Sequence, residues 1–144
     1  FNKVEMNVFT VPDVSVSDKK CLELLAIQEE IVKDLGLAYR VMNCCTGDLP
    51  HPNRRMYDLE TWFAGQGRYR ETHSCSNCTD FQTRRLKIKV KTKDGNKFVH
   101  ALNATAVTDR TVLAIIENFQ QKDGSVLVPR VLQALVGKDR IERL

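Results

Sequence analysis

The sequence predicts an α+β fold in which an antiparallel β-sheet is flanked by helices. Two observations support this prediction. Several segments with strand-like alternation follow one another at hairpin-like spacing, and the helical segments between them show no regular strand–helix–strand rhythm. We therefore expect the strands to pair antiparallel.

The composition limits the classes of protein to which the chain can belong. Its 144 residues, 42% of them hydrophobic, are enough for one globular core. The longest apolar runs, such as 112–116, are too short to cross a bilayer, so we expect no membrane contact. A net charge of +4 gives weak support to a polyanionic partner. Five cysteines, an odd number, argue against a disulfide framework and favour a reducing compartment.

The first quarter of the chain predicts a strand and a long helix. Residues 1–11 alternate apolar and polar from the first position, and a terminus cut through a strand suggests a fragment of a longer protein. Ser15 and Asp18 have the spacing of a capping box for the helix that follows, and Gly36 suits its C-terminal end. The apolar face of this helix consists of Cys21, Leu24, Leu25, Ile31, Val32 and Leu35.

The middle of the chain alternates strands with turns. Residues 38–46 are typical of a buried strand, and the glycine and two prolines of 47–53 mark a loop. We expect another strand at 54–63, followed by a turn at 65–74 that leads into a further strand. The segment 78–85 suits a short helix or turn.

A hairpin is predicted after this short helix. Residues 86–92 alternate apolar side chains with lysines, which we interpret as the solvent side of a half-buried strand in preference to a nucleic-acid contact. The tetrapeptide "KDGN" supplies a turn into a strand at 97–107.

A second helix is expected from Thr108 to the "KDG" that ends near residue 124, with Val112, Ile115, Ile116 and Phe119 on one face. Arg110 falls in its first turn, where the helix dipole disfavours a cation. A helix N-terminus binds anions, and an arginine there adds a bidentate donor for phosphate. The alternative is an arginine that reaches solvent or pairs with Asp109 or Glu117.

Other polar side chains favour the same chemistry. Asn103 and Thr105 share a face of the 97–107 strand because they are two residues apart. Glu71 and Ser74 are expected at the end of the preceding strand. A carboxylate, hydroxyls, an amide and an arginine together suit a polar small molecule that carries phosphates and Mg²⁺.

Cys75 and Cys78 form a C-x-x-C pair, for which we weighed a zinc site and a redox dithiol. Zinc prefers four ligands, and the side chains of Cys44 and Cys45 would point to opposite faces of a strand. Even with His73 the ligand set is incomplete. A thioredoxin-like dithiol requires a strand–helix–strand context that the sequence lacks. We therefore expect buried thiols without zinc.

Longer motifs in the chain resemble those of seryl-tRNA synthetases, a family of class II aminoacyl-tRNA synthetases. The segment "YRETHSCSNCTDFQTRR" resembles their "REISSCSNCTDFQARR" block, and "ALNATAVTDRTVLAIIENFQQKDGSVLVP" resembles their motif 3. "FNKVEM" is similar to the second strand of motif 2, and "YRVMNCCTGD" and "YDLETWF" are similar to the strands between. The segment "QQKDGSVLVP...LQALVGKDRI" looks most like the animal mitochondrial branch.

The resemblance implies a fold and a reaction. Residues 1–144 would be the C-terminal part of the catalytic domain, from the second strand of motif 2 through motif 3. The enzyme would activate L-serine with ATP and Mg²⁺ to seryl-adenylate and transfer the seryl group to tRNA(Ser). Glu5 would bind the ammonium group of serine, while Asn103 and Thr105 would recognise the amino acid.

The resemblance also implies the ATP site. Phe1 would stack on adenine, and Glu71 and Ser74 would hold Mg²⁺ near the α-phosphate. Arg110 would bind the γ-phosphate, and Arg110 and Glu71 would be the catalytic residues. The ATP-binding set as a whole is Phe1, Glu71, Thr72, His73, Ser74 and Arg110.

Two positions depart from the family pattern. One residue fewer separates Asn103 from Arg110, and His73 replaces a small residue. Motif 1 and the first strand of motif 2 are absent from these 144 residues, so we expect the isolated chain to be inactive and the homodimer to form through upstream regions. The compartment would be the mitochondrial matrix or the cytoplasm. The alternative is a non-catalytic relative that serves as a structural subunit of a larger, organellar assembly.

Overall fold

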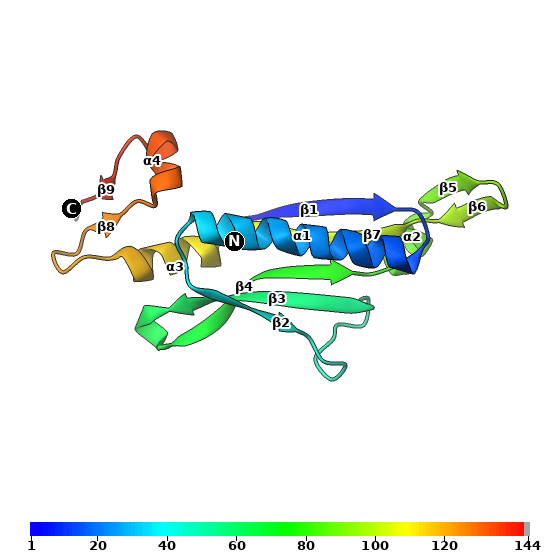
Figure 1. The fold of residues 1–144 in the computed structure, drawn as a ribbon, viewed down its shortest axis with the longest axis horizontal. Helices are drawn as coiled ribbons and strands as arrows, with labels where there is room; N and C mark the ends of the chain where they lie inside the picture. The colour runs from blue at the N-terminus through cyan, green and yellow to red at the C-terminus, as the bar shows by residue number, and fades with distance from the viewer. Residues whose placement is uncertain (143–144) are drawn as a thin grey trace.

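A five-stranded antiparallel sheet forms the centre of the protein (Figure 1). The computed structural model describes residues 1–142. The strands lie in the order β1-β7-β4-β3-β2, and every neighbouring pair is antiparallel, which confirms the predicted fold class. The five strands are β1 (Lys3–Thr10), β2 (Tyr39–Asn43), β3 (Arg55–Phe63), β4 (Arg68–Asn77) and β7 (His100–Thr108).

Helix α1 (Val14–Asp34) covers one face of this sheet (Figure 1). Its buried residues Cys21, Leu24 and Leu25 belong to a hydrophobic core with Cys75 of β4 and Ala104 of β7. The helix ends before Gly36, as predicted, and Gly36 adopts the left-handed φ of +72° that favours glycine.

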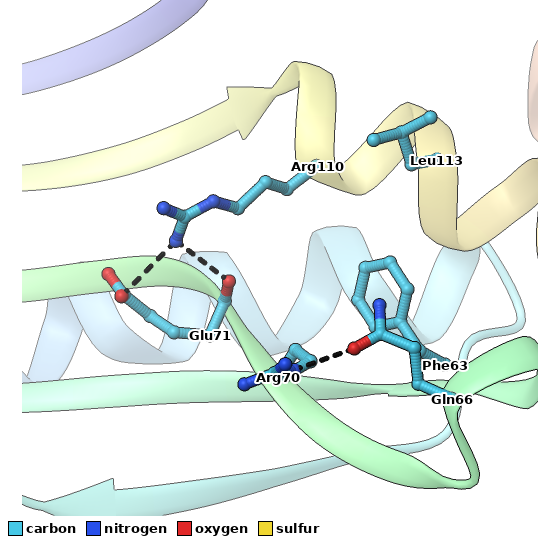
Figure 2. Close-up of a pocket in the computed structure, with 6 residues that line it drawn as sticks. All are labelled: Phe63, Gln66, Arg70, Glu71, Arg110 and Leu113. Atoms are coloured by element: carbon cyan, nitrogen blue, oxygen red, sulfur yellow. Dashed lines mark hydrogen bonds and ion pairs between the residues drawn. The ribbon is translucent and has the colours of Figure 1, made fainter.

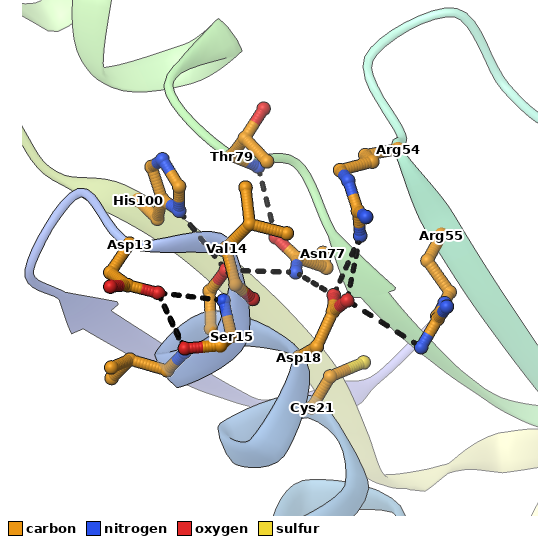
Figure 3. A network of polar contacts seen from close by, with 12 residues as sticks. Asp13, Val14, Ser15, Asp18, Cys21, Arg54, Arg55, Asn77, Thr79 and His100 are labelled. Atoms are coloured by element: carbon orange, nitrogen blue, oxygen red, sulfur yellow. Dashed lines mark hydrogen bonds and ion pairs between the residues drawn. The ribbon is translucent and has the colours of Figure 1, made fainter.

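The predicted capping box of α1 is wrong. Asp13 is the N-cap, because its extended backbone lets Oδ1 accept hydrogen bonds from the backbone N–H groups of Ser15 and Val16. Ser15 already lies inside the helix and donates its hydroxyl to Asp13 (Figure 3). Asp18 instead accepts hydrogen bonds from the side chains of Arg54 and Asn77, which fastens the start of α1 to the sheet (Figure 3).

Helix α3 (Asp109–Phe119) begins directly after Thr108, which forms a capping box with Thr111. Its predicted apolar face is confirmed in part: Ile115 and Phe119 pack against the second core cluster, but Val112 and Ile116 are 47% and 40% exposed. Thr111 and Ala114 are the fully buried residues of this helix. Ala114 belongs to the second core cluster. Small side chains at 111 and 114 allow α3 to pack closely against the core. This close packing determines which face of the helix is buried. The second core cluster consists of Val32, Leu35, Leu37, Leu59, Phe63 and Ala114.

The strands of the middle region differ from prediction in two places. Strand β2 lies at the edge of the sheet, with Arg40 and Met42 exposed, so it is not the buried strand expected at 38–46. The turn expected at 65–74 is shorter, because the 3-10 helix η1 (Ala64–Gln66) and Gly67 complete it. Strand β4 therefore begins at Arg68.

The helix and strand boundaries in the hairpin region also differ from the prediction. Helix α2 (Phe81–Leu86) extends to Leu86, so only Lys89–Thr92 forms strand β5, which pairs with β6 (Gly95–Phe98) in a separate two-stranded sheet. Residue 99 interrupts the strand expected at 97–107.

Beyond α3 lie the remaining elements (Figure 1). These are β8 (Val126–Leu127), α4 (Arg130–Val136) and β9 (Arg140–Ile141). Within residues 1–142, none of the helices combines the length and apolar character that crossing a bilayer requires.

Candidate active site

The strand register places polar side chains together on one face of the sheet. Residues directly opposite on antiparallel strands share a face, and so do residues two apart on one strand. Asp58 lies opposite Ser74, and Glu60 lies opposite Glu71. Glu71 and Ser74 are three residues apart and would point to opposite faces of a regular strand. A register shift at Thr72 adds the extra residue that brings both to the same face.

The same argument adds residues from β1 and β7. Asn103 lies opposite Ser76 on one side and Asn7 on the other, and Thr105 lies opposite Glu5. Cys75 and Ala104 occupy the other face, where they pack with α1. We call the face not covered by α1 the polar face. Its polar residues are Glu5, Asn7, Asp58, Glu60, Glu71, Ser74, Ser76, Asn103 and Thr105.

An exposed ion pair joins α3 to β4 at this face. Nη1 of Arg110 lies 3.2 Å from the backbone oxygen and 3.3 Å from Oε2 of Glu71, as Figure 2 shows. The two side chains are 56% and 43% exposed, so the guanidinium keeps donors that face solvent. The alternative pairing of Arg110 with Asp109 or Glu117 does not occur: Asp109 accepts from the backbone of Asn2, and Glu117 accepts from the backbone N–H of residue 65.

The Arg110–Glu71 pair lies between two cavities. The larger, of about 390 Å³, is also lined by Phe63, Gln66 and Arg70 (Figure 2). The smaller, of about 120 Å³, has a wall formed by four further side chains. They are Phe1, Lys3, Thr72 and Thr105, and Thr108 completes the lining. The structure thus brings five of the predicted residues to one polar hollow beside the α3 N-terminus, namely Phe1, Glu71, Thr72, Thr105 and Arg110. The predicted residues Glu5, Ser74 and Asn103 lie on the polar face but line neither cavity.

Glu5 retains hydrogen-bonding capacity on the polar face, opposite Thr105. Lys3 Nζ forms an ion pair with Glu5 Oε2 at 3.2 Å, but this buried carboxylate oxygen accepts no hydrogen bond from residues 1–142. A buried acceptor without a donor favours binding of a ligand that carries N–H groups.

Gln28 supports the site from the opposite face and was missed by the sequence analysis. Its buried side-chain amide donates to the backbone oxygens of Ser74 at 2.9 Å and Thr105 at 2.8 Å. The β4–β7 pairing runs from Cys75 to Asn77, so the amide joins the two strands where that pairing stops. A polar residue at position 28 within the apolar face of α1 was the available signal.

His73 does not line the polar face, which corrects its predicted place in the ATP site. Its side chain is 1% exposed and lies opposite Leu59 of the second core cluster. The ring nitrogen Nδ1 lies 2.8 Å from the hydroxyl of Thr72. Burial lowers the pKa of His73 from 6.5 to about 4, so the folded protein holds the neutral imidazole at pH 7.

Asp58 and Glu60 are further acids of the polar face that the sequence analysis missed. Burial raises the pKa of Asp58, and the negative charge of Glu71 raises it further. Oδ1 of Asp58 is buried without a hydrogen-bond partner within residues 1–142, whereas Oδ2 accepts from the thiol of Cys44 at 3.3 Å. Asp58 and Glu60 are two residues apart in a predicted strand, and this spacing was the signal that could have placed them beside Glu71.

Residues 1–119 match the family model described as the tRNA synthetase class II core domain (G, H, P, S and T). The chain belongs to this family. Among curated relatives, it is 50% identical over 144 residues to a serine–tRNA ligase of Thermodesulfovibrio yellowstonii and 48% identical over 140 residues to one of Maridesulfovibrio salexigens. The matches cover 98% and 95% of this chain but 34% and 32% of the relatives, so the chain spans about a third of their length.

Solved structures agree with this assignment to the class II core family. Seryl-tRNA synthetase from Pyrococcus horikoshii, complexed with ATP, superimposes with a TM-score of 0.94 at 41% identity over all of this chain and 32% of that one. The cytoplasmic serine–tRNA ligase of Naegleria fowleri, in complex with AMP, gives a TM-score of 0.89 at 39% identity. The match covers 99% of this chain and 34% of that one.

Arg110 reaches β4 although one residue fewer separates it from Asn103 than in the family pattern. The pairing of β1 with β7 shifts between Val4 and Glu5, so that Val4 lies opposite residue 107 while Glu5 lies opposite Thr105. Arg110 still reaches Glu71 after this irregularity. The contraction therefore does not turn the guanidinium away from β4.

The donors on the polar face fit Mg²⁺ better than zinc. Glu71 and Ser74 offer oxygen atoms, and Mg²⁺ is usually held by one or two carboxylates together with phosphates and water. Within residues 1–142, no group of three or more His, Cys, Asp and Glu side chains could hold a metal by itself. The Cys75 sulfur lies 3.6 Å from that of Cys21 on the α1 side, and the neighbouring thiol and burial raise the pKa of Cys75.

Proposed function

We propose that the protein is a serine–tRNA ligase that uses ATP to form seryl-adenylate and then transfers the seryl group to tRNA(Ser). The observation that carries this proposal is the Arg110–Glu71 pair, which lines both cavities beside the N-terminus of α3. High identity to serine–tRNA ligases over nearly the whole chain and the likeness to an ATP-complexed synthetase support it.

In the first step, a carboxylate oxygen of serine attacks the α-phosphorus of ATP, and the bond to the pyrophosphate oxygen breaks. Arg110 binds the γ-phosphate, where its positive charge and the N-terminus of α3 stabilise the leaving group. Phe1 stacks on adenine; its side chain is 88% exposed and lies at the edge of the smaller cavity. Glu71 and Ser74 would hold Mg²⁺, which supplies positive charge at the phosphates.

Serine is oriented by the strands that lie beside this nucleotide site. The Glu5 carboxylate, whose Oε2 is ion-paired with Lys3 but accepts no hydrogen bond within residues 1–142, accepts hydrogen bonds from the serine ammonium group. Asn103 and Thr105 recognise the rest of the amino acid from the adjacent strand β7. Catalysis in this scheme comes from positioning and charge stabilisation, without a covalent enzyme intermediate. In the second step, a hydroxyl of the terminal ribose of tRNA(Ser) attacks the seryl carbonyl and AMP leaves.

Serine-dependent exchange of labelled pyrophosphate into ATP by the full-length protein tests the proposal. Exchange that requires serine, and that alanine supports poorly, is expected because alanine lacks the hydroxyl group. A well-folded full-length protein without exchange would favour the non-catalytic structural subunit.

We also propose a location and an assembly for the whole protein. The resemblance of residues 120–141 to the animal mitochondrial branch supports the mitochondrial matrix, with the cytoplasm as the alternative. None of the relatives named above is described as mitochondrial, so they lend this location no support. We expect a homodimer. Cell fractionation and sedimentation of the full-length protein test these two points.

A further inference from the structure

The β5–β6 hairpin projects beyond one end of the central sheet (Figure 1). It forms its own two-stranded sheet and joins the body through α2 and the backbone hydrogen bonds of Ile88 with Thr83 and Val99. Both strands are largely exposed, so the hairpin adds little to the hydrophobic core. A projection of this kind calls for an explanation other than core packing.

Positive charge is concentrated in this hairpin and the end of α2. Seven of the chain's 22 Lys and Arg residues lie within 84–97, together with a single acid, Asp94. The rest of the sequence contains more acids than bases, although the whole chain has a net charge of +4. The positive charge of the chain is therefore a local property of this segment.

Most of these cations have no acidic partner. Arg84 pairs with Asp80, and Lys97 pairs with Asp94. Among residues 1–142, the other five cations of the segment form no ion pair, and all are exposed. They are Arg85, Lys87, Lys89, Lys91 and Lys93. Exposed like charges this close repel one another, and a bound polyanion would remove that repulsion.

The strand geometry arranges the cations in a row. Lys89 and Lys91 are two apart on β5 and therefore share a face, about 7 Å apart along the strand. This spacing is comparable to the distance between successive phosphates of an RNA strand. Phe98 lies opposite Lys89 on the same face, with the ammonium 4.9 Å from the ring centroid, which adds an aromatic surface on which a base could stack.

We propose that this lysine hairpin, residues 84–97, binds the phosphate backbone of RNA. If the protein is a serine–tRNA ligase, that RNA is its tRNA substrate, and in this respect the inference rests on the proposed function. An extended row of cations with an adjacent aromatic ring fits an RNA strand better than a membrane surface, because membrane-surface elements present a broad apolar face beside their cations.

A triple alanine variant of the full-length protein tests the hairpin. The variant changes Lys89, Lys91 and Lys93, and its matched control changes Lys19, Lys122 and Lys138, which are exposed and form no ion pair among residues 1–142. Binding to a labelled tRNA(Ser) transcript and to oligouridine is measured by fluorescence anisotropy at several salt concentrations. Loss of three phosphate contacts should weaken binding at least about tenfold near 0.1 M salt and reduce the slope of log affinity against log salt by about 2.

The results separate this inference from the proposed function. Weaker RNA binding by the hairpin variant but not the control, with serine-dependent pyrophosphate exchange unchanged, supports the hairpin as an RNA site. The same loss of RNA binding in a protein that lacks exchange would uphold the hairpin and overturn the ligase. Equal RNA affinity of the hairpin variant and the control overturns the inference. Loss of binding to phosphatidylserine vesicles without loss of RNA binding would assign the lysines to a membrane surface instead.

Discussion

Replacing His73 with phenylalanine should remove a pH dependence of stability that the structure predicts. The imidazole is buried and neutral in the folded protein, where its pKa is about 4, but it takes up a proton below about pH 6.5 when the chain unfolds. Between these two values the unfolded state binds more protons, so acidification favours unfolding. Since each tenfold change in a protonation equilibrium is worth about 1.4 kcal/mol, the difference corresponds to about 3 kcal/mol.

Urea denaturation followed by the fluorescence of Trp62, the single tryptophan, measures this effect between about pH 7.5 and about pH 4. The free energy of unfolding of the wild type should fall across this range by about 3 kcal/mol more than that of His73→Phe. His51→Ala is the matched control, because His51 is exposed and should leave the dependence unchanged. Parallel stability curves for the wild type and His73→Phe would refute the reasoning.

Two further predictions concern how α1 is held to the sheet. Asp18→Ala should lower the free energy of unfolding by about 2 kcal/mol, because Arg54 and Asn77 lose a partly buried charged partner, whereas Glu23→Ala, which breaks an exposed pair on the same helix, should leave the denaturation midpoint unchanged. Gln28→Met keeps the side-chain length but leaves two backbone oxygens without their donor, so unfolding should become easier by about 2 to 4 kcal/mol and the rate of pyrophosphate exchange should fall.

The sequence predicted the sheet and its main helices well because both have strong periodic signals. Alternation identified β1, and the apolar spacing of α1 predicted its buried face. The errors arose where contacts with neighbouring elements determine which residues are buried. Strand β2 has the pattern of a buried strand, but its place at the sheet edge exposes alternate residues. Which face of α3 is buried depends on how closely Ala114 can approach Leu59 and Phe63. The apolar pattern of the helix by itself gives no information about that contact.

The candidate site was predictable where residues lie two apart on one strand, as Asn103 and Thr105 do. It was less predictable where a bulge changes the facing of side chains. The extra residue at Thr72 places Glu71 with Ser74 on the polar face and directs His73 into the core. No spacing rule reveals a bulge, so the family resemblance, carried over residue by residue, placed His73 beside ATP. Likewise, the Arg110–Glu71 pair joins residues that are distant in sequence and close only in the folded sheet.

The most direct test of the central claim, that the polar face activates serine, is the rate of serine-dependent pyrophosphate exchange in Arg110→Ala. If Arg110 stabilises the phosphates in the transition state, its loss should cost about 2 kcal/mol or more, which is roughly a 30-fold lower rate. Arg130→Ala, which removes an exposed arginine near the start of α4, is the matched control and should keep the wild-type rate. Exchange by Arg110→Ala at the wild-type rate would contradict the account.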